Sequence, residues 1–381
     1  MMDTVWVIDT LPASGCQMIE KAVQILKEHY DLGDLSNAEE LLGGTVNRSF
    51  AVSAKRKGHC VKYFIRQYNP AIAENEIRFE HALISHIKKN GFDLAAGVIP
   101  SKTGATYIKQ EGALNGRIHM DLWAVYEFIE GECRYAWFDT NITREDMISA
   151  AEVLADLHQA GQDFHKPKGS DRRQPPIMEF LPTLRQVYAA YTSKAGKTRF
   201  DQRFRQYHDR ILRAIDQALI PEHDCSKMPR LPIHCDFHQG NLKYEGSRVT
   251  GIFDFDWSKI DLRLFDLALA LVYFCACWDG PATGSLMLDK FELFLRIYND
   301  RCASKSGPGS LTELEKTSLP SILAAANLFV LHWTIFDFYR IENPDTDEYL
   351  VYLNHYLELM NWIETQKDRI AGIIDQTAQK I

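Results

Sequence analysis

The sequence has no surplus of positive charge. Its 381 residues include 43 lysines and arginines against 51 aspartates and glutamates, and the formal net charge is −8. Proteins whose main partner is nucleic acid or an anionic membrane normally carry a basic surface. We therefore expect neither partner, and the acidic balance favours a cationic small molecule over an anionic one.

The sequence also has little that is typical of an exported or membrane-bound chain. The stretch from Met1 to Trp6 has neither a basic region nor an apolar one, so it predicts no secretory signal. The longest apolar run, 267–278, is shorter than the ~20 residues that span a bilayer, and it predicts a buried helix instead. We predict a cytoplasmic location.

Paired cysteine motifs are absent as well. The eight cysteines include no C-x-x-C spacing, and several lie among apolar residues, as Cys275 and Cys277 do. This pattern predicts reduced thiols rather than a disulfide framework or a zinc site. The sequence shows neither internal repeats nor low-complexity segments. Its length predicts one large domain or two medium ones. We expect a monomer or a homodimer.

A polar stretch at 233–242, with a second one at 252–256, carries the chemistry. Asp236 is followed by Asn241 five residues later, and Asp254 comes thirteen residues after that. Transfer of a phosphoryl group requires a carboxylate that orients the incoming hydroxyl, and oxygen ligands for magnesium. The spacing supplies both, because apolar residues around a turn at 245–246 predict a hairpin that joins the two stretches.

These motifs resemble those of the aminoglycoside phosphotransferase and choline kinase group, which includes type II homoserine kinases. The resemblance is strong over 233–270 and weaker over 40–131. It rests on a joint pattern whose members are His234, Asp236, Asn241, Asp254, Asp256 and Asp266-Leu267-Ala268.

The resemblance implies an α+β, two-lobed protein-kinase-like fold. Residues 1–130 would form a nucleotide-binding lobe with an antiparallel sheet, and residues 131–381 a mainly helical lobe with the catalytic loop and acceptor site. The sequence has no Asp-Phe-Gly and Ala-Pro-Glu pair, and His238 stands where protein kinases commonly carry lysine. Both departures favour the small-molecule branch.

The nucleotide-binding residues are implied by the same resemblance. A loop and strand at 43–52 would cover the nucleotide through Gly44, Asn47 and Ser49, although an ordinary hairpin explains the same residues. The segment 125–131 resembles the family hinge, whose backbone, here at Glu127 and Ile129, would bind the adenine.

A cation on the strand 60–66 would hold the phosphates of the nucleotide. Alternation places Lys62 and Arg66 on one face, and the family pattern favours Arg66. Glu80, on an amphipathic helix predicted at 72–89, would pair with it, and Glu76 one turn earlier is the substitute. Solvent-exposed charges at an edge strand and a helix are the alternative.

The resemblance also assigns roles in the second lobe. Asp236 would act as the base, Asn241 and Asp254 would hold Mg²⁺, and Asp256 would reach the metal through water. His234 would orient the loop by bonding backbone carbonyls. Asp266 would cap the following helix and bond toward the catalytic loop.

Two rival interpretations of the same stretch stay open. His234, Asp236 and His238 are alternate residues, so on one strand they would share a face and could ligate zinc in a hydrolase. A kinase-shaped scaffold without turnover is the second rival. Neither explains the residues better than a kinase, because base and metal ligands are all present.

The predicted function is therefore transfer of the γ-phosphate of ATP to a hydroxyl of a small polar molecule. An aminoglycoside, homoserine, choline or another amino alcohol or sugar all fit, and ATP is not distinguished from GTP. Carboxylates at Asp279, Asp337 and Glu342, near the ends of predicted apolar helices, could attract an amine on the acceptor. Ordinary surface charge is the alternative explanation for these three.

Overall fold

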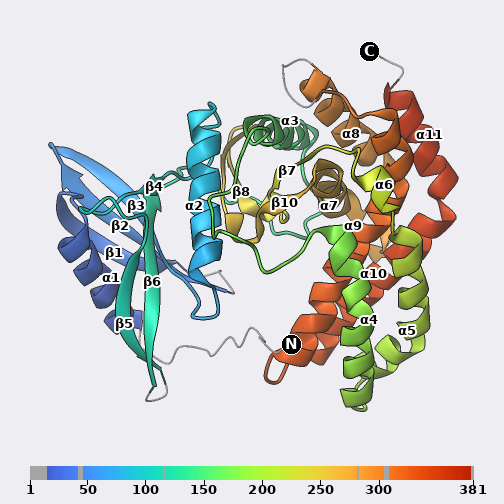
Figure 1. Ribbon diagram of the computed structural model, residues 1–381, viewed down its shortest axis with the longest axis horizontal. Coiled ribbons are helices and arrows are strands. Elements are labelled where there is room, and N and C mark those ends of the chain that lie inside the picture. Colours follow the sequence, from blue (N-terminus) through green and yellow to red (C-terminus); the bar gives the residue numbers. More distant parts are fainter. Residues whose placement is uncertain (1–14, 42–45, 115–116, 281–282, 304–308, 379–381) are drawn as a thin grey trace. The chain divides into compact units, whose positions relative to one another are not determined.

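The computed structural model describes the chain except residues 1–14, 42–45, 115–116, 281–282, 304–308 and 379–381 (Figure 1). The chain divides into two compact units. The first comprises Met1–Glu130 with Lys166–Asp171, and the second comprises Gly131–His165 with Arg172–Ile381. No local pattern in the sequence assigns Lys166–Asp171 to the first unit, so its membership is a tertiary feature.

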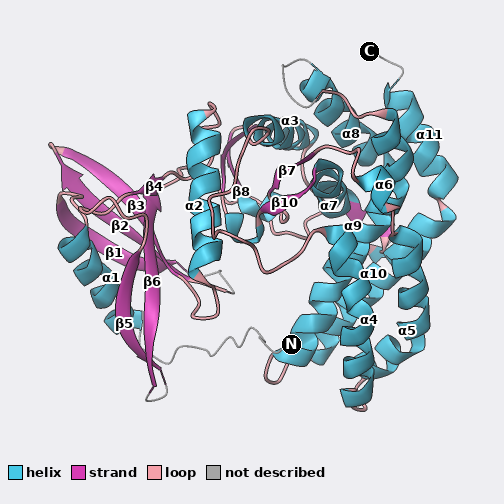
Figure 2. Ribbon diagram, viewed as in Figure 1, coloured by secondary structure: helices cyan, strands magenta, loops and turns pink. Residues whose placement is uncertain are grey.

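The first unit is built on an antiparallel sheet in the order β1-β2-β3-β6-β4, with β5 paired to β6 (Figure 2). Helix α1 (Gly15–His29) packs on β1 and β2, and its apolar face joins a core that includes Phe50 and Trp123, whose rings stack at 5.9 Å. The strands are β1 (Asp34–Leu41), β2 (Arg48–Arg56), β3 (His59–Gln67), β4 (Val98–Ile99), β5 (Ile108–Leu114) and β6 (Arg117–Glu127).

Strand β1 was not predicted from the sequence. Its residues, DLSNAEEL, lack an alternating apolar pattern, and none of them is buried. The strand exists because its backbone pairs with β2 in a register that runs from Asp34 opposite Lys55 to Leu41 opposite Ser49. By contrast, α2 (Glu74–Lys89) lies within the predicted range, with Ile77, Leu83, Ile84 and Ile87 buried on one face.

The second unit is mainly helical (Figure 2). Among its described residues, the helices are α3 (Arg144–Ala160), α4 (Ile177–Lys194), α5 (Arg199–Ala218), α6 (Glu222–Cys225), α7 (Arg263–Cys275), α8 (Leu288–Ala303), α9 (Glu313–Arg340), α10 (Thr346–Thr365) and α11 (Lys367–Ala378). Its short strand pairs are β7 (Arg230–Ile233) with β10 (Lys259–Leu262), β8 (Leu242–Glu245) with β9 (Arg248–Ile252), and β11 (Ala276–Cys277) with β12 (Ser285–Leu286). The antiparallel sheet of the first unit and the helices of the second confirm the predicted α+β class.

Helix α7 begins earlier than the sequence suggested. It starts at Arg263, so Asp266 lies within its first turn and the prediction that Asp266 caps the helix is wrong. The buried guanidinium of Arg263 pairs with the Glu315 carboxylate at 2.7 Å and donates to the carbonyls of Gly309 and Ser310. This buried cluster fixes the first residue of α7 in a helical position that apolar periodicity could not indicate.

Helix α9 is long and apolar enough to cross a membrane by length and composition, but 78% of its most apolar window is buried inside the protein. The central helix of a folded unit passes the same test. Here α9 packs against α5, α7 and α10, so its apolar residues are accounted for by the core.

Candidate active site

The catalytic stretch leaves strand β7 at Ile233 and turns sharply at Cys235, whose φ of 65° is a left-handed conformation that side chains other than glycine rarely adopt. The turn is held by Asp266 of α7. Its Oδ2 accepts from the backbone amide of His234 at 2.9 Å, and its Oδ1 accepts from that of Cys235 at 2.8 Å. One buried carboxylate therefore stabilises the backbone just before Asp236.

Asp266 is itself fixed by a buried histidine. Nε2 of His158, on α3, lies 3.0 Å from Oδ2 of Asp266, and Nδ1 of the same ring lies 2.7 Å from the hydroxyl of Tyr298 on α8. Burial raises the pKa of Asp266, but the His158 hydrogen bond and the nearby histidines outweigh it and leave that pKa below its usual range. Asp266 is therefore an anion held by α3 and by the loop that follows β7.

Asp236 presents a carboxylate that is 25% exposed and held on two sides. The amide Nδ2 of Asn241 donates to the carbonyl of Asp236 at 3.0 Å and to its Oδ2 at 3.1 Å, and the hydroxyl of Tyr273 lies 3.4 Å from Oδ1. Burial raises the pKa of Asp236, but its contacts with His238, His234 and Asn241 lower it on balance. The group is therefore ionised at neutral pH and is oriented to accept a proton.

His238 lies beside Asp236, and its hydrogen bonds indicate which ring nitrogen carries the proton. Nδ1 accepts from the backbone amide of Gly240 at 3.1 Å, so in a neutral ring the hydrogen is on Nε2. Nε2 lies 3.6 Å from Oδ2 of Asp236, and the ring meets that of Tyr273 edge-on at 5.2 Å. His238 therefore presents a donor toward the carboxylate.

The hairpin of β8 and β9 brings the two polar stretches together, as the sequence predicted. Leu242 pairs with Ile252, and the carbonyl of Asn241 accepts from the amide of Phe253 at 3.2 Å. His234 donates from Nε2 to the Phe253 carbonyl at 3.0 Å, the kind of orienting contact that the family pattern implied. Burial lowers the pKa of His234, so the ring stays neutral in this position.

The predicted metal ligands follow directly from this hairpin. Asp254 adopts a left-handed conformation, with φ 70° and ψ 54°, and starts the 3-10 turn Phe255–Trp257 that carries Asp256. Both protons of the Asn241 amide point to Asp236, so its Oδ1 faces away, and no described residue donates to it. Amide and carboxylate oxygens are hard donors, and this set suits Mg²⁺ rather than zinc.

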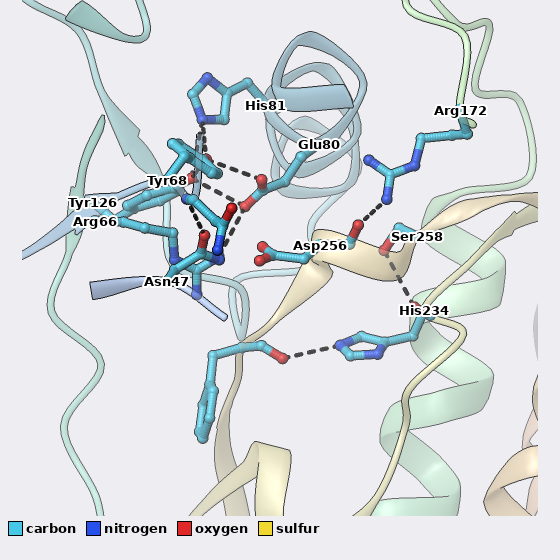
Figure 3. A network of polar contacts seen from close by, with 12 residues as sticks. Asn47, Arg66, Tyr68, Glu80, His81, Tyr126, Arg172, His234, Asp256 and Ser258 are labelled. Carbon is cyan, nitrogen blue, oxygen red and sulfur yellow. Dashed lines mark hydrogen bonds and ion pairs between the residues drawn. The ribbon is translucent and has the colours of Figure 1, made fainter. Parts of the chain in front are cut away.

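The turn that carries Asp256 has a partner that the sequence did not suggest. Arg172 donates from its guanidinium to the backbone carbonyl of Asp256 (Figure 3). Ser258 on the other side of the turn lies with its hydroxyl 3.5 Å from the carbonyl of His234 (Figure 3). Arg172 comes from a Pro-rich segment without periodicity, so no local signal could have identified it.

In the first unit, the structure brings Arg66 and Glu80 together. Nη1 of Arg66, at the end of β3, lies 3.6 Å from Oε1 of Glu80 on α2, and both side chains are buried. Lys62, the alternative cation, is exposed and lies over the ring of Phe128 at 5.2 Å. Glu76 instead closes the helix start, because its Oε2 accepts from the backbone amide of Ala73 at 3.3 Å.

Glu80 is surrounded by hydroxyl donors that sequence reasoning missed (Figure 3). The hydroxyl of Tyr68 donates to Oε2 and that of Tyr126 to Oε1, both at 3.0 Å. Nε2 of His81 lies 3.1 Å from the first hydroxyl and 3.0 Å from the second. The two hydroxyls also contact each other, so Glu80, Tyr68, Tyr126 and His81 form one buried hydrogen-bonded cluster.

The residues predicted to cover the nucleotide have structural contacts of their own. Asn47 Oδ1 accepts from the backbone amide of Asn69 at 2.9 Å, which ties the end of the loop to the residue pair after β3. Ser49 lies opposite Arg66 in the β2–β3 ladder. Gly44 lies outside the described residues.

The predicted adenine-binding segment ends strand β6. The amide of Glu127 donates to the carbonyl of Gly97 at 2.8 Å, and its side chain accepts from Lys88 and from the amide of Gly97, both at 2.9 Å. Ile129 lies in the irregular segment after the strand. These hydrogen bonds fix the position of the backbone at the end of β6.

The geometry does not support the zinc interpretation. The chain leaves β7 at Ile233, so His234, Asp236 and His238 do not share a strand face as that interpretation requires. His234 Nε2 is bonded to a carbonyl, and no cluster of three His, Cys, Asp or Glu side chains that could hold a metal occurs among the described residues.

Comparisons with known proteins agree on the class of the fold and the activity. The profile of the phosphotransferase enzyme family (APH) matches residues 37–294. A homoserine kinase of Afipia carboxidovorans is 26% identical over 313 residues, covering 82% of both chains. A microcompartment-associated aminopropanol kinase has a TM-score of 0.62 at 14% identity, covering 92% of this chain and 98% of that one. Amicoumacin kinase in complex with AMP-PNP, Ca²⁺ and Ami has a TM-score of 0.60 at 16% identity, covering 91% and 94%.

Proposed function

The chain belongs to the phosphotransferase enzyme family and is a small-molecule kinase, and we propose that it transfers the γ-phosphate of ATP to a hydroxyl of an amine-bearing acceptor with Asp236 as the base. The observation that carries the proposal is the state of Asp236: a partly exposed, ionised carboxylate whose two oxygens are oriented by Asn241 and Tyr273. A base must reach the hydroxyl proton in a defined geometry, and this arrangement supplies both reach and orientation.

Mg²⁺ would be held by Asn241 through Oδ1 and by Asp254, with Asp256 reaching it through water. The donor set fits a divalent cation that prefers oxygen. When bound, Mg²⁺ supplies positive charge for the phosphate oxygens. The residues of this chain keep those donors in place: Asn241 is fixed by Asp236, and the turn after Asp254 is fixed by Arg172.

The nucleotide would be held by the first unit. Arg66, kept in position by Glu80, would neutralise the phosphates, and the stretch with Gly44, Asn47 and Ser49 would cover them through backbone amides. The backbone of Glu127 and Ile129 would bind the adenine. These assignments rest on the family pattern and on the buried Arg66–Glu80 pair.

The acceptor would carry an amine as well as a hydroxyl. Support comes from the acidic charge of the chain and from two similar proteins whose names state such acceptors, a homoserine kinase and an aminopropanol kinase. The hydroxyl proton would pass to Asp236 as the acceptor oxygen bonds to the γ-phosphorus and the bond to the β–γ bridging oxygen breaks, releasing ADP.

Thermal unfolding with ligands tests the nucleotide and metal assignments. ATP should raise the melting temperature only when Mg²⁺ is present, since a ligand that binds the native state stabilises it by mass action. Asp254→Asn should weaken this response, whereas Asp209→Asn, at a carboxylate that is 85% exposed on α5, should not. Stoichiometric zinc together with no response to ATP would support the hydrolase instead.

A panel of acceptors with ATP and Mg²⁺ tests turnover. ADP release that depends on an amino alcohol or hydroxy amino acid supports the proposal. An ATP·Mg²⁺ response in the melting experiment without turnover on any acceptor would instead support a nucleotide-binding scaffold. If a neutral sugar is the best acceptor, the kinase assignment stands and the proposal that the acceptor carries an amine is wrong.

A further inference from the structure

The segment that leads into α4 makes a pattern of contacts that the sequence did not indicate. Three hydrogen bonds join residues 172–177 to residues 256–261, and the partners in each bond are 84 positions apart in the sequence. The pairs are Arg172 with Asp256, Pro175 with Lys259, and Ile177 with Asp261. A constant separation means that the two stretches run side by side in the same direction, as parallel strands do. The 172–177 segment therefore follows the chain from the turn 254–258, which carries the proposed metal ligands, into β10.

A side chain takes part in each of the three bonds. Pro175 and Pro176 have no amide hydrogen, so the segment cannot form the regular ladder of a strand. Instead, Nζ of Lys259 donates to the carbonyl of Pro175 at 2.9 Å, and Oδ2 of Asp261 accepts from the amide of Ile177 at 2.7 Å. The second bond also satisfies the start of α4, because Pro176 at its N-cap makes no side-chain hydrogen bond.

The end of the segment next to α4 is fixed by a buried ion pair. Lys259 and Asp261 lie 3.1 Å apart, and their side chains are 2% and 1% exposed. Their backbone belongs to β10, which pairs with β7 directly before the catalytic stretch. Charges buried in this way are costly to separate, so the end of the segment at Ile177 has little freedom to move.

The other end of the segment reaches the turn 254–258. The guanidinium of Arg172 is directed at the carbonyl of Asp256 and donates to it (Figure 3). The turn is also closed from within, because the amide of Ser258 donates to the carbonyl of Phe255 at 3.0 Å. Arg172 therefore adds a contact from outside the turn, at its middle residue.

The turn contains a residue in an unfavourable conformation. Asp254 has φ 70° and ψ 54°, a conformation that residues other than glycine rarely adopt and that persists only while the surroundings hold it. Before the turn, the amide of Phe253 bonds the carbonyl of Asn241 at 3.2 Å, and after the turn β10 pairs with β7. Between these two fixed points, the contact with Arg172 opposes relaxation of the turn.

We propose that Arg172 is a positioning residue for the metal site: it keeps the turn 254–258 in the conformation in which Asp254 and Asp256 bind Mg²⁺. This inference rests on the proposed kinase function and concerns the affinity for the metal. A metal binds only those molecules whose turn has the right conformation, so the apparent dissociation constant rises as their fraction falls. Without the guanidinium, the turn relaxes more often and Mg²⁺ binds more weakly.

A titration with Mg²⁺ tests the inference in the variant Arg172→Ala. The melting temperature is measured at a fixed ATP concentration while Mg²⁺ is raised, since binding to the native state stabilises it. The half-saturating Mg²⁺ concentration should rise about tenfold, the size of effect expected when a hydrogen bond from a charged group is lost. An unchanged concentration would overturn the inference, and so would a lower one, which would mean that the guanidinium mainly repels the metal.

A matched control and a chemical rescue separate positioning from overall stability. Arg185→Ala, at an α4 arginine that is 42% exposed and pairs with Asp216, should leave the titration unchanged. Free guanidinium, well below the concentrations that unfold the protein, should restore the titration of Arg172→Ala more than the same concentration of sodium chloride does. Arg172→Lys should fall between the wild type and Arg172→Ala, because an ammonium lacks the planar fork of donors. No rescue, together with a lower melting temperature of the ligand-free Arg172→Ala variant, would show a role in overall stability and overturn the inference.

Hydrogen exchange tests the same role without metal or nucleotide. The amides of Phe253 and Ser258 are hydrogen-bonded at the two ends of the turn. In Arg172→Ala both should exchange faster than in the wild type, whereas the amide of Ile177, which Asp261 holds, should exchange at the wild-type rate. Equal exchange in the two proteins, or faster exchange at all three amides, would contradict a local role for Arg172.

The outcomes separate this inference from the proposed function. A wild-type protein that responds to ATP with Mg²⁺, and an Arg172→Ala variant that titrates in the same way, would remove the inference and leave the kinase in place. No response of the wild type to ATP with Mg²⁺ would remove the proposed function and this inference with it.

Discussion

The two units hold the buried carboxylates next to their candidate site residues, Glu80 and Asp266, in different ways. In the first unit, Glu80 is bound by side chains: Arg66 on β3, Tyr68 directly after β3 and Tyr126 on β6. In the second, Asp266 is bound mainly by backbone amides of a loop that contains the left-handed Cys235. The contacts of Glu80 join side chains at helices and strands that form independently of them. The contacts of Asp266, in contrast, determine the path of the backbone in the loop at His234 and Cys235.

This difference indicates how each site should respond to substitution. Removal of one tyrosine hydroxyl next to Glu80 removes one hydrogen bond, while α2 and the sheet keep the other contacts of Glu80 in place. A lost acceptor at Asp266 releases two amides and a strained residue at once, because a left-handed conformation persists only while the surroundings hold it. We therefore expect graded effects in the first unit and collective effects in the second.

The largest effect should come from Asp236→Asn, which removes the proposed base and keeps the shape of the loop. Removal of a general base lowers kcat by about 10²–10⁴-fold. The affinity for ATP with Mg²⁺ should be nearly unchanged, since the base acts on the acceptor. Steady-state kinetics and the melting experiment measure the two quantities. Wild-type turnover in the variant would show that Asp236 is not the base.

The comparison is tested directly by Asp266→Asn. The new amide would turn a donor toward the backbone amides of His234 and Cys235, and we expect a loss of about 3 kcal/mol in the free energy of unfolding together with a fall in kcat. Urea unfolding and kinetics on the same preparation measure both.

Glu315→Gln is the matched control, because it breaks the buried ion pair with Arg263 at the start of the same helix, α7, and removes no acceptor of the loop amides. It should lower stability by a similar amount and leave kcat near the wild-type value. Equal losses of kcat in the two variants would mean that Asp266 acts through overall stability and not through the catalytic loop.

A smaller effect concerns pH and the first unit. Burial lowers the pKa of His81 to about 4, so the folded ring stays neutral while an unfolded histidine takes up a proton near pH 6.5. The unfolded chain thus binds more protons between these values, and stability falls as the pH drops, by about 2 kcal/mol from pH 6.5 to pH 5 for this one group.

His81→Gln isolates this contribution, since glutamine keeps a donor for the two tyrosine oxygens and does not titrate. Urea unfolding at pH 7 and pH 5 should show a smaller loss on acidification in the variant than in the wild type. The same loss in both would place the pH dependence in other groups.

The smallest expected effects differ between the two units: a variant in the first unit should change the KM for ATP, and a variant in the second should change kcat. Tyr126→Phe removes one hydrogen bond to Glu80 and should raise the KM for ATP about fivefold, the equivalent of about 1 kcal/mol, with little change in kcat. Tyr273→Phe removes a contact of Asp236 and should lower kcat by a similar factor with the KM for ATP unchanged. If each variant changes both parameters alike, the two tyrosines do not act on separate sites.

The sequence alone was enough to predict that the candidate catalytic residues lie together. Asp236, Asn241 and Asp254 are close in sequence, and the turn and strand residues between them predict a hairpin. Their spacing therefore already indicates that they lie near one another. The N-cap of α3 is equally local, with Thr143 Oγ1 accepting from the amide of Asp146 at 3.1 Å. Helices and short hairpins follow from contacts within a few residues, and these are visible in a sequence.

Other features depended on the tertiary structure. Tyr68 and Tyr126 meet at Glu80 from positions 58 residues apart, and Arg172 reaches Asp256 across 84 residues. Strand β1 is a strand only because β2 pairs with it. No local pattern identifies such residues, because the sequence around a tyrosine or arginine does not show whether its side chain is exposed or bonded to a distant residue. The aromatic contacts of α9 and α10 are of this kind: the rings are spaced by each helix, but which rings meet was decided by the packing of the two helices against each other and against the turn that carries Asp256.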